Sequence, residues 1–269
     1  MSHATILAVF AHPDDEAFGT GGTLARYAAE GCDVYLVTAT RGEAGQSVRP
    51  DLAIPASLPA VREQELRCAC AAYGIHPPIF LDYLDGHLTI VPQGQAVGKL
   101  VRIVRRLRPQ VLITFGPDGI YGHYDHLAVH RWATAAFDLA ADPDCFPDRD
   151  ACQPHQISKL YYRVLTEEML ASRAQAGQRP AVVMDGVPFP FVGYPQSAIT
   201  TVLDVTPYLE AKRRGILCHA TQVSPDSRYA QPLEAMAGDP WFCQETYILA
   251  RSTLPHVEGI ETDLLAGLR

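Results

Sequence analysis

Short apolar runs alternate along the chain with longer segments in which apolar residues recur every three or four positions. Runs of the first kind predict strands, and the longer spacing predicts helices. The expected strands are residues 4–10, 33–38, 79–81, 111–115, 159–164, 199–204 and 245–250. The expected helices are residues 23–30, 60–73, 93–107, 127–139, 166–176 and 206–217, with a weak helix at 228–237. This alternation predicts an α/β fold, a Rossmann-like and mostly parallel sheet with helices on both faces, whose first four strands are ordered 3-2-1-4.

Polar segments directly follow the first four of these strands. They are AHPDDE at residues 11–16, TRGEAG at 40–45, DYLDG at 82–86 and GPDGIYGHYDH at 116–126. In open α/β sheets, ligands bind outside the carboxyl ends of the strands. Because parallel strands end at the same edge of the sheet, we expect these four segments to surround one site.

Histidine and aspartate mark the first and fourth of these segments. Imidazole and carboxylate groups such as those of His12 and Asp15 are common zinc ligands, and a spare carboxylate beside a metal can act as a general base. His123 and His126 are three residues apart and can converge on one point, while Asp125 can hydrogen-bond an imidazole and set its tautomer. A single histidine would favour a structural role, and the acidic segment alone would favour a helix cap. The two clusters at one edge of the sheet favour a metal site at the carboxyl ends of the strands.

The glycines at positions 19, 21 and 22 suggest a dinucleotide-binding loop, which the rest of the pattern argues against. Leu24 stands where the third glycine of GxGxxG would be, and the segment between the first strand and the helix is long and acidic. The second strand also lacks the terminal acid that would hold a ribose. We therefore expect these glycines to let the backbone pass close to the metal-binding segment.

Two further residues, Arg62 and Asp85, are candidates for contact with a ligand, but each could also have a purely structural role. Arg62 lies in the first turns of the expected helix 60–73, where a solvent-exposed charge is the more frequent role. Asp85 precedes Gly86, a pair typical of a tight turn, although the loop lies at the same edge of the sheet. At this point a structural role and a ligand role are both open for each residue.

Composition narrows the class of protein. The chain has 269 residues, of which 48% are hydrophobic, and we expect a single domain over residues 1–269. A net charge of −8 argues against a nucleic-acid partner, because phosphate binding requires a basic face. The chain has no apolar run long enough to span a membrane, and Met1-Ser2-His3 lacks the basic start of a signal peptide.

The seven cysteines are odd in number and scattered, without a CxxC pair. We expect neither a disulfide framework nor a cysteine zinc knuckle, and a reducing cytoplasm as the location. Cys68 and Cys70 are two residues apart on an expected helix, so they should point to different faces.

Residues 177–196 are rich in proline, glycine and aromatic side chains, a composition poor for either a helix or a strand. We expect an ordered loop here. Its aromatic residues around 189–194 fit either a lid over the site or a contact between subunits of a homo-oligomer.

Taken together, the motifs resemble those of a known family, the LmbE-like zinc deacetylases. The similarity spans residues 4–225 and rests on HPDDE at 12–16, TRGEAG at 40–45, Arg62 with Glu65, Asp85-Gly86, HxDH at 123–126 and HxTQ at 219–222. The superfamily includes the N-acetylglucosaminyl-phosphatidylinositol de-N-acetylases and the deacetylases of mycothiol and bacillithiol synthesis. Its Rossmann-like sheet, with a metal at the strand ends, agrees with the pattern above.

The resemblance implies a catalytic role for each matching residue near the metal. The implied zinc ligands are His12, Asp15 and His126. Asp14 would be the general base. The oxyanion would be stabilised by His123, with Asp125 behind it, and Tyr121 would be a mobile polarising group beside the substrate carbonyl.

The resemblance also places Arg62 and Asp85 at the sugar end of the substrate, with Glu43 on the same wall. One position departs from the family, because Tyr124 stands where proline is usual between the histidine and the aspartate. Proline fixes φ, so the loop is expected to be freer here, or Tyr124 packs on the substrate.

The implied substrate is a small-molecule N-acetylglucosamine conjugate, with the glucosaminyl-malate precursor of bacillithiol as one candidate. Arg62 or Arg41 could then pair with an anionic aglycone. The expected cofactor is Zn²⁺, with Fe²⁺ as the alternative for two histidines and one aspartate. Two other functions are weighed against this one, a zinc amidase that cleaves thiol conjugates and a non-catalytic sugar-binding metalloprotein.

Overall fold

The computed structural model describes residues 4–147, 152–178, 180–184, 186–255 and 259–269. Its central layer is a sheet with the strand order β3-β2-β1-β4-β5-β10-β9, and β8 pairs with the end of β5. Strands β3, β2, β1, β4 and β5 run parallel, whereas β10 runs antiparallel to both β5 and β9. The strands are β1 (Thr5–Phe10), β2 (Asp33–Thr38), β3 (Ile79–Phe80), β4 (Val111–Phe115), β5 (Lys159–Thr166), β8 (Gly193–Tyr194), β9 (Thr201–Asp204) and β10 (Gln244–Ser252). The predicted fold class and the order 3-2-1-4 are confirmed.

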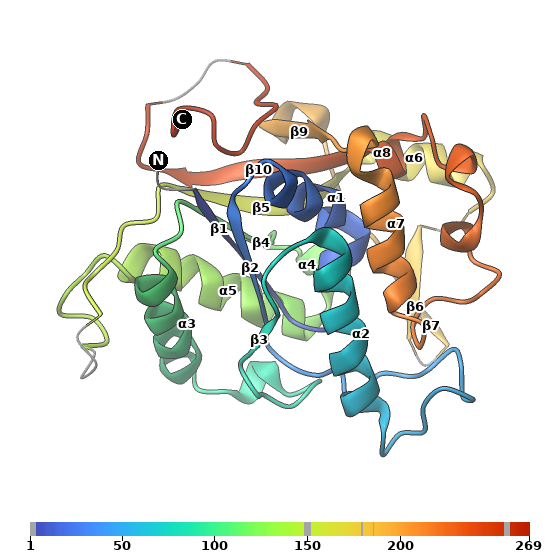
Figure 1. Cartoon of the computed structure of the whole chain (residues 1–269), viewed down its shortest axis with the longest axis horizontal. Helices are drawn as coiled ribbons and strands as arrows, with labels where there is room; N and C mark the ends of the chain where they lie inside the picture. Colours follow the sequence, from blue (N-terminus) through green and yellow to red (C-terminus); the bar gives the residue numbers. More distant parts are fainter. Residues whose placement is uncertain (1–3, 148–151, 179, 185, 256–258) are drawn as a thin grey trace.

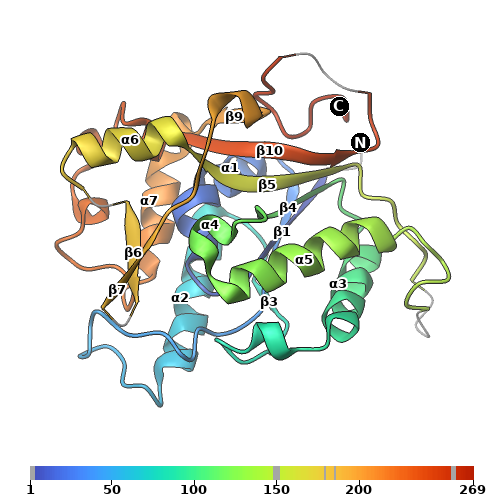
Figure 2. The same cartoon turned by 180° about the vertical axis from the view of Figure 1, so that it is seen from behind.

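Helices cover both faces of the sheet, as Figures 1 and 2 show from opposite sides. On one face, α1 (Asp15–Ala29), α2 (Leu58–Tyr73) and α7 (Leu209–Cys218) pack against one another, and on the other face α3 (Gln93–Leu107) packs against α5 (Tyr124–Leu139). The shorter helices are α4 (Gly119–Gly122), α6 (Glu167–Gln175) and α8 (Pro240–Cys243). Because both faces are covered, the central strand β4 is buried along its whole length, which explains its continuous apolar sequence. No helix among the described residues is long and apolar enough to cross a membrane.

Helix α1 begins eight residues earlier than expected, at Asp15 instead of residue 23. Its glycines therefore lie inside the helix and not in a loop beside the metal-binding segment. A β-carbon on Gly22 would lie 2.5 Å from the side chain of Val205, and one on Gly21 would lie 3.0 Å from the hydroxyl of Tyr73. The glycines let α1 pack closely against its neighbours, so our interpretation of them was wrong.

The far end of the chain supports α1 through Glu245, a fully buried residue of β10. Its carboxylate accepts hydrogen bonds from the backbone amides of Gly22 and Thr23 at 3.0 and 2.7 Å. The ammonium group of Lys212, on α7, lies 2.8 Å from the same carboxylate. Three elements that are distant in sequence therefore meet at one buried ion pair under the helix that follows the HPDDE segment.

Residues 177–196 are not a loop throughout. They contain an antiparallel hairpin of β6 (Ala181–Met184) and β7 (Val187–Pro190), followed by β8. The proline-rich sequence concealed this hairpin because Pro188 and Pro190 lie in a two-stranded ribbon, where a proline can avoid the donor positions. The amide of Val192 then donates to the carbonyl of Ile120 at 2.8 Å, so the segment lies against α4.

The expectation that no disulfide forms was wrong. Cys68 of α2 and Cys218 at the end of α7 are bonded, with their α-carbons 5.7 Å apart. The two residues are 150 positions apart and meet because α2 packs on α7, a contact that cysteine spacing could not reveal. Cys70 is buried and free, which confirms that it and Cys68 point to different faces. The cysteine pattern therefore no longer supports a reducing compartment.

We predict that Glu245→Ala lowers the free energy of unfolding by about 3–5 kcal/mol, because it leaves the buried ammonium group of Lys212 without its carboxylate partner. Urea unfolding followed by circular dichroism measures the change. Glu210→Ala, which removes an exposed glutamate of α7, is the control and should change stability by less than about 0.5 kcal/mol. A loss below about 1 kcal/mol for Glu245→Ala would contradict a supporting role for this ion pair.

Candidate metal centre

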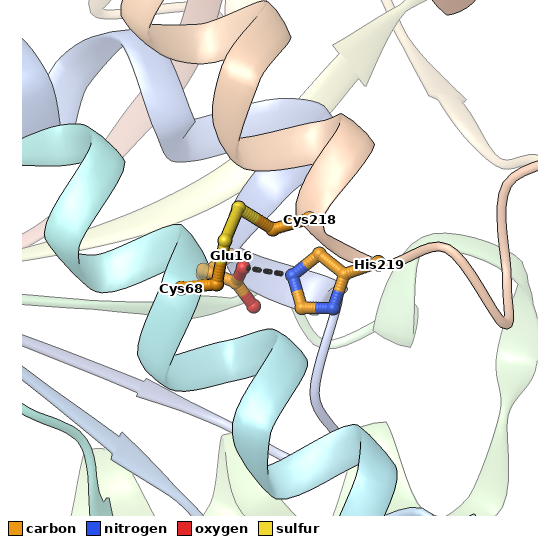
Figure 3. Close-up of a disulfide and its surroundings, with 4 residues drawn as sticks. All are labelled: Glu16, Cys68, Cys218 and His219. Atoms are coloured by element: carbon orange, nitrogen blue, oxygen red, sulfur yellow. Dashed lines mark hydrogen bonds and ion pairs between the residues drawn. A yellow bond between two sulfur atoms is a disulfide. The ribbon is translucent and has the colours of Figure 1, made fainter. Parts of the chain in front are cut away.

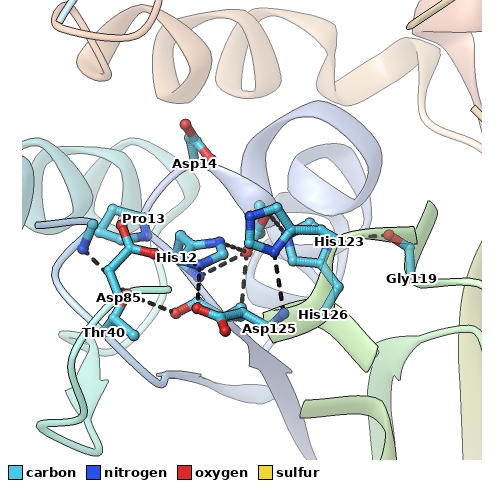
Figure 4. A network of polar contacts seen from close by, with 12 residues as sticks. His12, Pro13, Asp14, Thr40, Asp85, Gly119, His123, Asp125 and His126 are labelled. Atoms are coloured by element: carbon cyan, nitrogen blue, oxygen red, sulfur yellow. Dashed lines mark hydrogen bonds and ion pairs between the residues drawn. The ribbon is translucent and has the colours of Figure 1, made fainter. Parts of the chain in front are cut away.

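All four polar segments meet at the carboxyl edge of the sheet in one network, drawn in Figure 4, where Thr40 represents the segment after β2. His12 follows β1, Asp85 follows β3, and Asp125 and His126 lie in the first turn of α5. All four are buried, with at most 8% of their surface exposed. The prediction that these segments surround one site therefore agrees with the structure.

His12 has carboxylates at both ring nitrogens. Its Nε2 lies 3.0 Å from Asp85 and 3.3 Å from Asp125, and its Nδ1 lies 3.4 Å from Asp15. Two carboxylates at Nε2 require a proton on that nitrogen, which in the neutral ring leaves the lone pair on Nδ1, facing Asp15. Asp85 and Asp125 thus orient the imidazole, as carboxylates behind metal-binding histidines commonly do.

His126 is oriented in the same way by a backbone group. Its Nδ1 donates to the carbonyl of Gly119 at 3.0 Å, so the lone pair lies on Nε2. That Nε2 is buried and has no hydrogen-bond partner among the residues that the structure describes, yet it lies 3.2 Å from a carboxylate oxygen of Asp15. Two lone pairs facing each other in a buried place repel unless a cation or a proton lies between them. The orphaned nitrogen is the observation that fits a metal ion.

The pKa values of the cluster lead to the same conclusion. Burial lowers the pKa of His12, but hydrogen bonds to Asp125, Asp15 and Asp85 outweigh it and hold the pKa well above its usual value. Burial acts to raise the pKa of Asp15, and its charge interaction with His126 and its hydrogen bonds to both histidines depress it well below the usual range. The cluster therefore stabilises an added positive charge, and a divalent cation would supply it in place of protons.

In the described part of the chain, two groups of three residues bring candidate ligand atoms within 4.8 Å of one another. One is His12 with His123 and His126, and the other is His12 with Asp85 and Asp125. The second group is held together by the hydrogen bonds of His12, so its atoms are already engaged. Asp15, which the resemblance favours over His123, contacts both His12 and His126.

Asp125 lies behind His12 and not behind His123 as expected. Its carboxylate also accepts the backbone amides of Gly86 and Leu88 at 2.7 and 3.0 Å. His123 instead contacts the backbone of Asp125: its Nδ1 accepts a hydrogen bond from the Asp125 amide at 3.2 Å. Burial, together with the charges of His126 and His12, lowers the pKa of His123 to about 4. His123 is therefore a neutral imidazole with its proton on Nε2, a donor for an oxygen atom in the site.

Asp14 occupies a turn between β1 and α1 with φ of 97°, a left-handed conformation that is costly for any residue except glycine. Figure 4 shows its side chain directed away from the histidine cluster. The guanidinium of Arg62 lies 3.1 Å from its carboxylate. Burial raises the pKa of Asp14 to about 6, although the charge of Arg62 opposes the rise. The carboxylate is thus held beside the metal cluster without joining it.

Arg62 is not a solvated helix charge, because only 4% of its surface is exposed. Besides Asp14 it donates to the carbonyls of Pro13 and Gly42, which fixes the two loops relative to each other. Arg41 is similarly engaged, at 2.6 Å from both Glu63 and Asp82. Both guanidinium groups are therefore paired within the chain, which weakens the expected pairing of either with an anionic aglycone.

Glu43 and Asp85 lie on one wall, as expected. Glu43 accepts the amide of Asp85 at 3.3 Å, and Asp85 in turn accepts the amide of Ala44 at 3.0 Å.

Tyr121 lies on α4, with its ring centroid 5.2 Å from that of His126. Burial, together with the charge of Asp15, raises its pKa, so the hydroxyl stays protonated. The ring centroid of Phe191 lies 6.0 Å from that of Tyr121, so the aromatic segment reaches the site.

Two buried residues of the site had no assigned role in the sequence analysis. Glu16 is 1% exposed and lies 2.7 Å from Nε2 of His219, which is fully buried. The sequence motifs pointed to both residues, because Glu16 belongs to HPDDE and His219 to HxTQ. What the sequence could not show is that α7 brings residue 219 next to residue 16.

Comparisons with known proteins agree with this geometry. A family model described as GlcNAc-PI de-N-acetylase (PIG-L) matches residues 7–137. The chain is 35% identical to 1D-myo-inositol 2-acetamido-2-deoxy-alpha-D-glucopyranoside deacetylase 1 of Catenulispora acidiphila, over 98% of this chain and 89% of that protein. It is 38% identical to the deacetylase of the same description from Thermobifida fusca, over 99% and 100% of the two chains.

Two solved structures share the fold. The conserved protein TT1542 from Thermus thermophilus aligns with a TM-score of 0.64 and 25% identity, over 94% of this chain and 98% of that one. The N,N'-diacetylchitobiose deacetylase from Pyrococcus horikoshii aligns with a TM-score of 0.67 and 21% identity, over 90% and 82%. At that identity the second likeness shows the fold alone.

We predict that His126→Ala loses the bound metal, because the orphaned Nε2 is removed from the cluster. Metal content of the purified protein, measured by inductively coupled plasma mass spectrometry, should fall from about one ion per chain to near zero. His130→Ala, one turn further along α5, is the matched control. It removes an imidazole whose Nδ1 bonds the carbonyl of Phe115 and should leave the metal content unchanged. A His126→Ala protein with full metal content would remove His126 from the ligand set.

Proposed function

From the premise that the chain belongs to the PIG-L family of GlcNAc-PI de-N-acetylases, we propose that it hydrolyses the acetamide of an inositol glycoside of N-acetylglucosamine. As a member of this family, the chain is an N-deacetylase that acts on N-acetylglucosamine conjugates. Its activity depends on a metal ion, as in the rest of the family. The products would be acetate and the free amine of the glucosamine unit. The observation that supports a hydrolytic site most directly is the orphaned Nε2 of His126 facing Asp15, with the carboxylate of Asp14 held beside them.

The residues that would hold the metal are His12 through Nδ1, Asp15 through its carboxylate and His126 through Nε2. Three protein ligands leave room for water and substrate, the pattern of a catalytic zinc site. When bound, zinc would lower the pKa of water and polarise the acetamide carbonyl. Fe²⁺ is the alternative, since two histidines and a carboxylate also suit that ion.

Asp14 would act as the general base that takes the proton from the attacking water and returns it to the leaving nitrogen. Its carboxylate is turned away from the ligand atoms and is 20% exposed, so it can reach solvent while its neighbour Asp15 cannot leave the cluster. His123 would donate from Nε2 to the oxygen that becomes negative. Tyr121 keeps its proton and can support the same oxygen.

The wall formed by Glu43 and Asp85 would bind the hydroxyl groups of the sugar. Asp85 contributes one carboxylate oxygen to His12 and the other to Ala44, so it is held rigidly at the edge of the site. Arg62 would act chiefly by fixing Asp14, given its three contacts within the chain. This role of Arg62 differs from the contact with the sugar that the resemblance implied.

For the aglycone we propose myo-inositol. The relatives from Catenulispora acidiphila and Thermobifida fusca are both described as deacetylases of a 1D-myo-inositol glycoside. The malate glycoside finds no support in these relatives, and the guanidinium groups of Arg41 and Arg62 are already paired with carboxylates. Inositol carries no charge and needs neither arginine. No observation favours the thiol-conjugate amidase. We also propose a cytoplasmic location, in which the Cys68–Cys218 disulfide would be exposed to cellular reductants.

We predict that Asp14→Ala retains the metal but loses turnover by about 10²–10⁴-fold, the range typical of removing a general base. Amine release quantified with a fluorogenic amine reagent gives the rate, and metal analysis of the same sample gives the occupancy. Asp118→Ala, which removes an aspartate of the same rim that caps α4, serves as the comparison and should lose much less activity. Activity of Asp14→Ala within tenfold of the wild type would rule out this role.

We predict metal-dependent amine release from the inositol glycoside of N-acetylglucosamine, and slower release from the malate glycoside and from free N-acetylglucosamine. The three substrates are compared with metal-replete and chelated enzyme. Preference for the malate glycoside would overturn the aglycone, and absence of release from every substrate by metal-loaded protein would overturn the proposed reaction.

A further inference from the structure

The HxTQ motif at the end of α7 has no part in the reaction described above. Its histidine, His219, is fully buried and lies behind the catalytic turn, not within it. Nε2 of His219 is 2.7 Å from one carboxylate oxygen of Glu16, a contact drawn in Figure 3. Glu16 is itself 1% exposed, so this pair has no access to substrate and cannot take part in the chemistry directly.

The second carboxylate oxygen of Glu16 reaches the catalytic turn. It accepts the backbone amide of Asp14 at 3.0 Å. Asp14 is the residue whose φ is 97°, so this hydrogen bond fixes the backbone at its most strained point. A continuous path therefore leads from His219 through Glu16 to the residue that carries the proposed general base.

Helix α2 holds His219 in place from both sides along the chain. One residue before it, Cys218 is bonded to Cys68 of α2. Two residues after it, Thr221 donates its amide and its hydroxyl to Glu65 of α2, both at 2.7 Å. Because Glu65 and Cys68 are three residues apart on one helix, α2 presents both anchors on the same side.

We propose that His219 is a positioning residue that holds Asp14 in its catalytic conformation through Glu16, and that the Cys68–Cys218 disulfide keeps His219 in place. This inference rests on the role proposed for Asp14. A displacement of about 1 Å at a reacting group can reduce the rate by roughly 10²-fold. Loss of the path should therefore lower kcat while KM and metal content stay unchanged, because neither the sugar wall nor the metal ligands are touched.

The disulfide lies where a small thiol compound can reach it. It lines a surface hollow of about 420 Å³ together with Ala71, Arg214 and Leu217. A dithiol reductant would break the sulfur–sulfur bond by giving two electrons and two protons to the two cysteines, and would itself become a cyclic disulfide. The bonds between Thr221 and Glu65 remain after reduction, so reduction should lower kcat by less than loss of the imidazole does.

The test compares His219→Asn with His219→Gln. The amide nitrogen of glutamine can occupy the place of Nε2 and still donate to Glu16, whereas that of the shorter asparagine cannot reach it. We expect His219→Asn to lose kcat by roughly 10²-fold at unchanged KM, and His219→Gln to stay within about tenfold of the wild type. His155→Ala, which removes another buried histidine that bonds the carbonyl of Pro109, controls for stability and should not change kcat. Equal kcat for the asparagine and glutamine variants would overturn the positioning role.

A second readout does not depend on turnover. Hydrogen exchange of the Asp14 amide, followed by nuclear magnetic resonance, should be roughly tenfold faster in His219→Asn than in His219→Gln, because the bond from this amide to Glu16 is weakened. Unchanged exchange would overturn the path even if the enzyme acts on a substrate not tested. Conversely, accelerated exchange in a protein that releases no amine would support the path and reject the proposed reaction.

The disulfide is tested on the wild type and on Cys68→Ser, each with and without dithiothreitol. We expect the reductant to lower kcat and to speed Asp14 amide exchange in the wild type, to the level that Cys68→Ser shows throughout. Cys145→Ser, which changes a free cysteine remote from α7, should behave as the wild type. Complete reduction of the wild type is confirmed by thiol alkylation and mass spectrometry. If kcat and the exchange rate of the Asp14 amide stay unchanged after it, the anchoring role of the disulfide is overturned.

Discussion

The turn at Asp14 is the constraint on which the site depends. Within five residues after β1, the chain must direct His12 and Asp15 toward His126 and direct Asp14 elsewhere. A left-handed backbone at a residue other than glycine achieves this, at a cost on the order of 1–3 kcal/mol. Arg62 and Glu16 offset that cost by binding the side chain and the amide of the same residue.

A second constraint is the density of charge in a buried place. The carboxylates of Asp15, Asp85 and Asp125 all contact His12, and each also has a fixed partner elsewhere. Backbone amides donate to the carboxylates of all three residues, and in Asp15 they reach Oδ2. The other oxygen of Asp15, Oδ1, faces Nε2 of His126, and it is the oxygen that the proposed ion would contact.

Much of the architecture follows from local pattern, and the errors have identifiable causes. Strands β1, β2 and β4 and helix α3 were predicted nearly to their ends, because their apolar patterns are strong. The start of α1 was missed because three glycines argue against a helix when only propensity is known, and tertiary packing explains them. The disulfide and the contact of His219 with Glu16 depend on how α7 packs on α1 and α2, which no spacing within the sequence encodes.

The buried carboxylate of Glu245 has a consequence for how the protein is made. Ribosomes deliver the HPDDE segment first, yet the group that binds the amides of Gly22 and Thr23 emerges more than 220 residues later. At the ~5–20 residues added per second during translation, the nascent chain carries the histidine and aspartate of the proposed metal site for many seconds before α1 has its partner. The site is thus among the first parts of the protein to be synthesised and among the last to be completed.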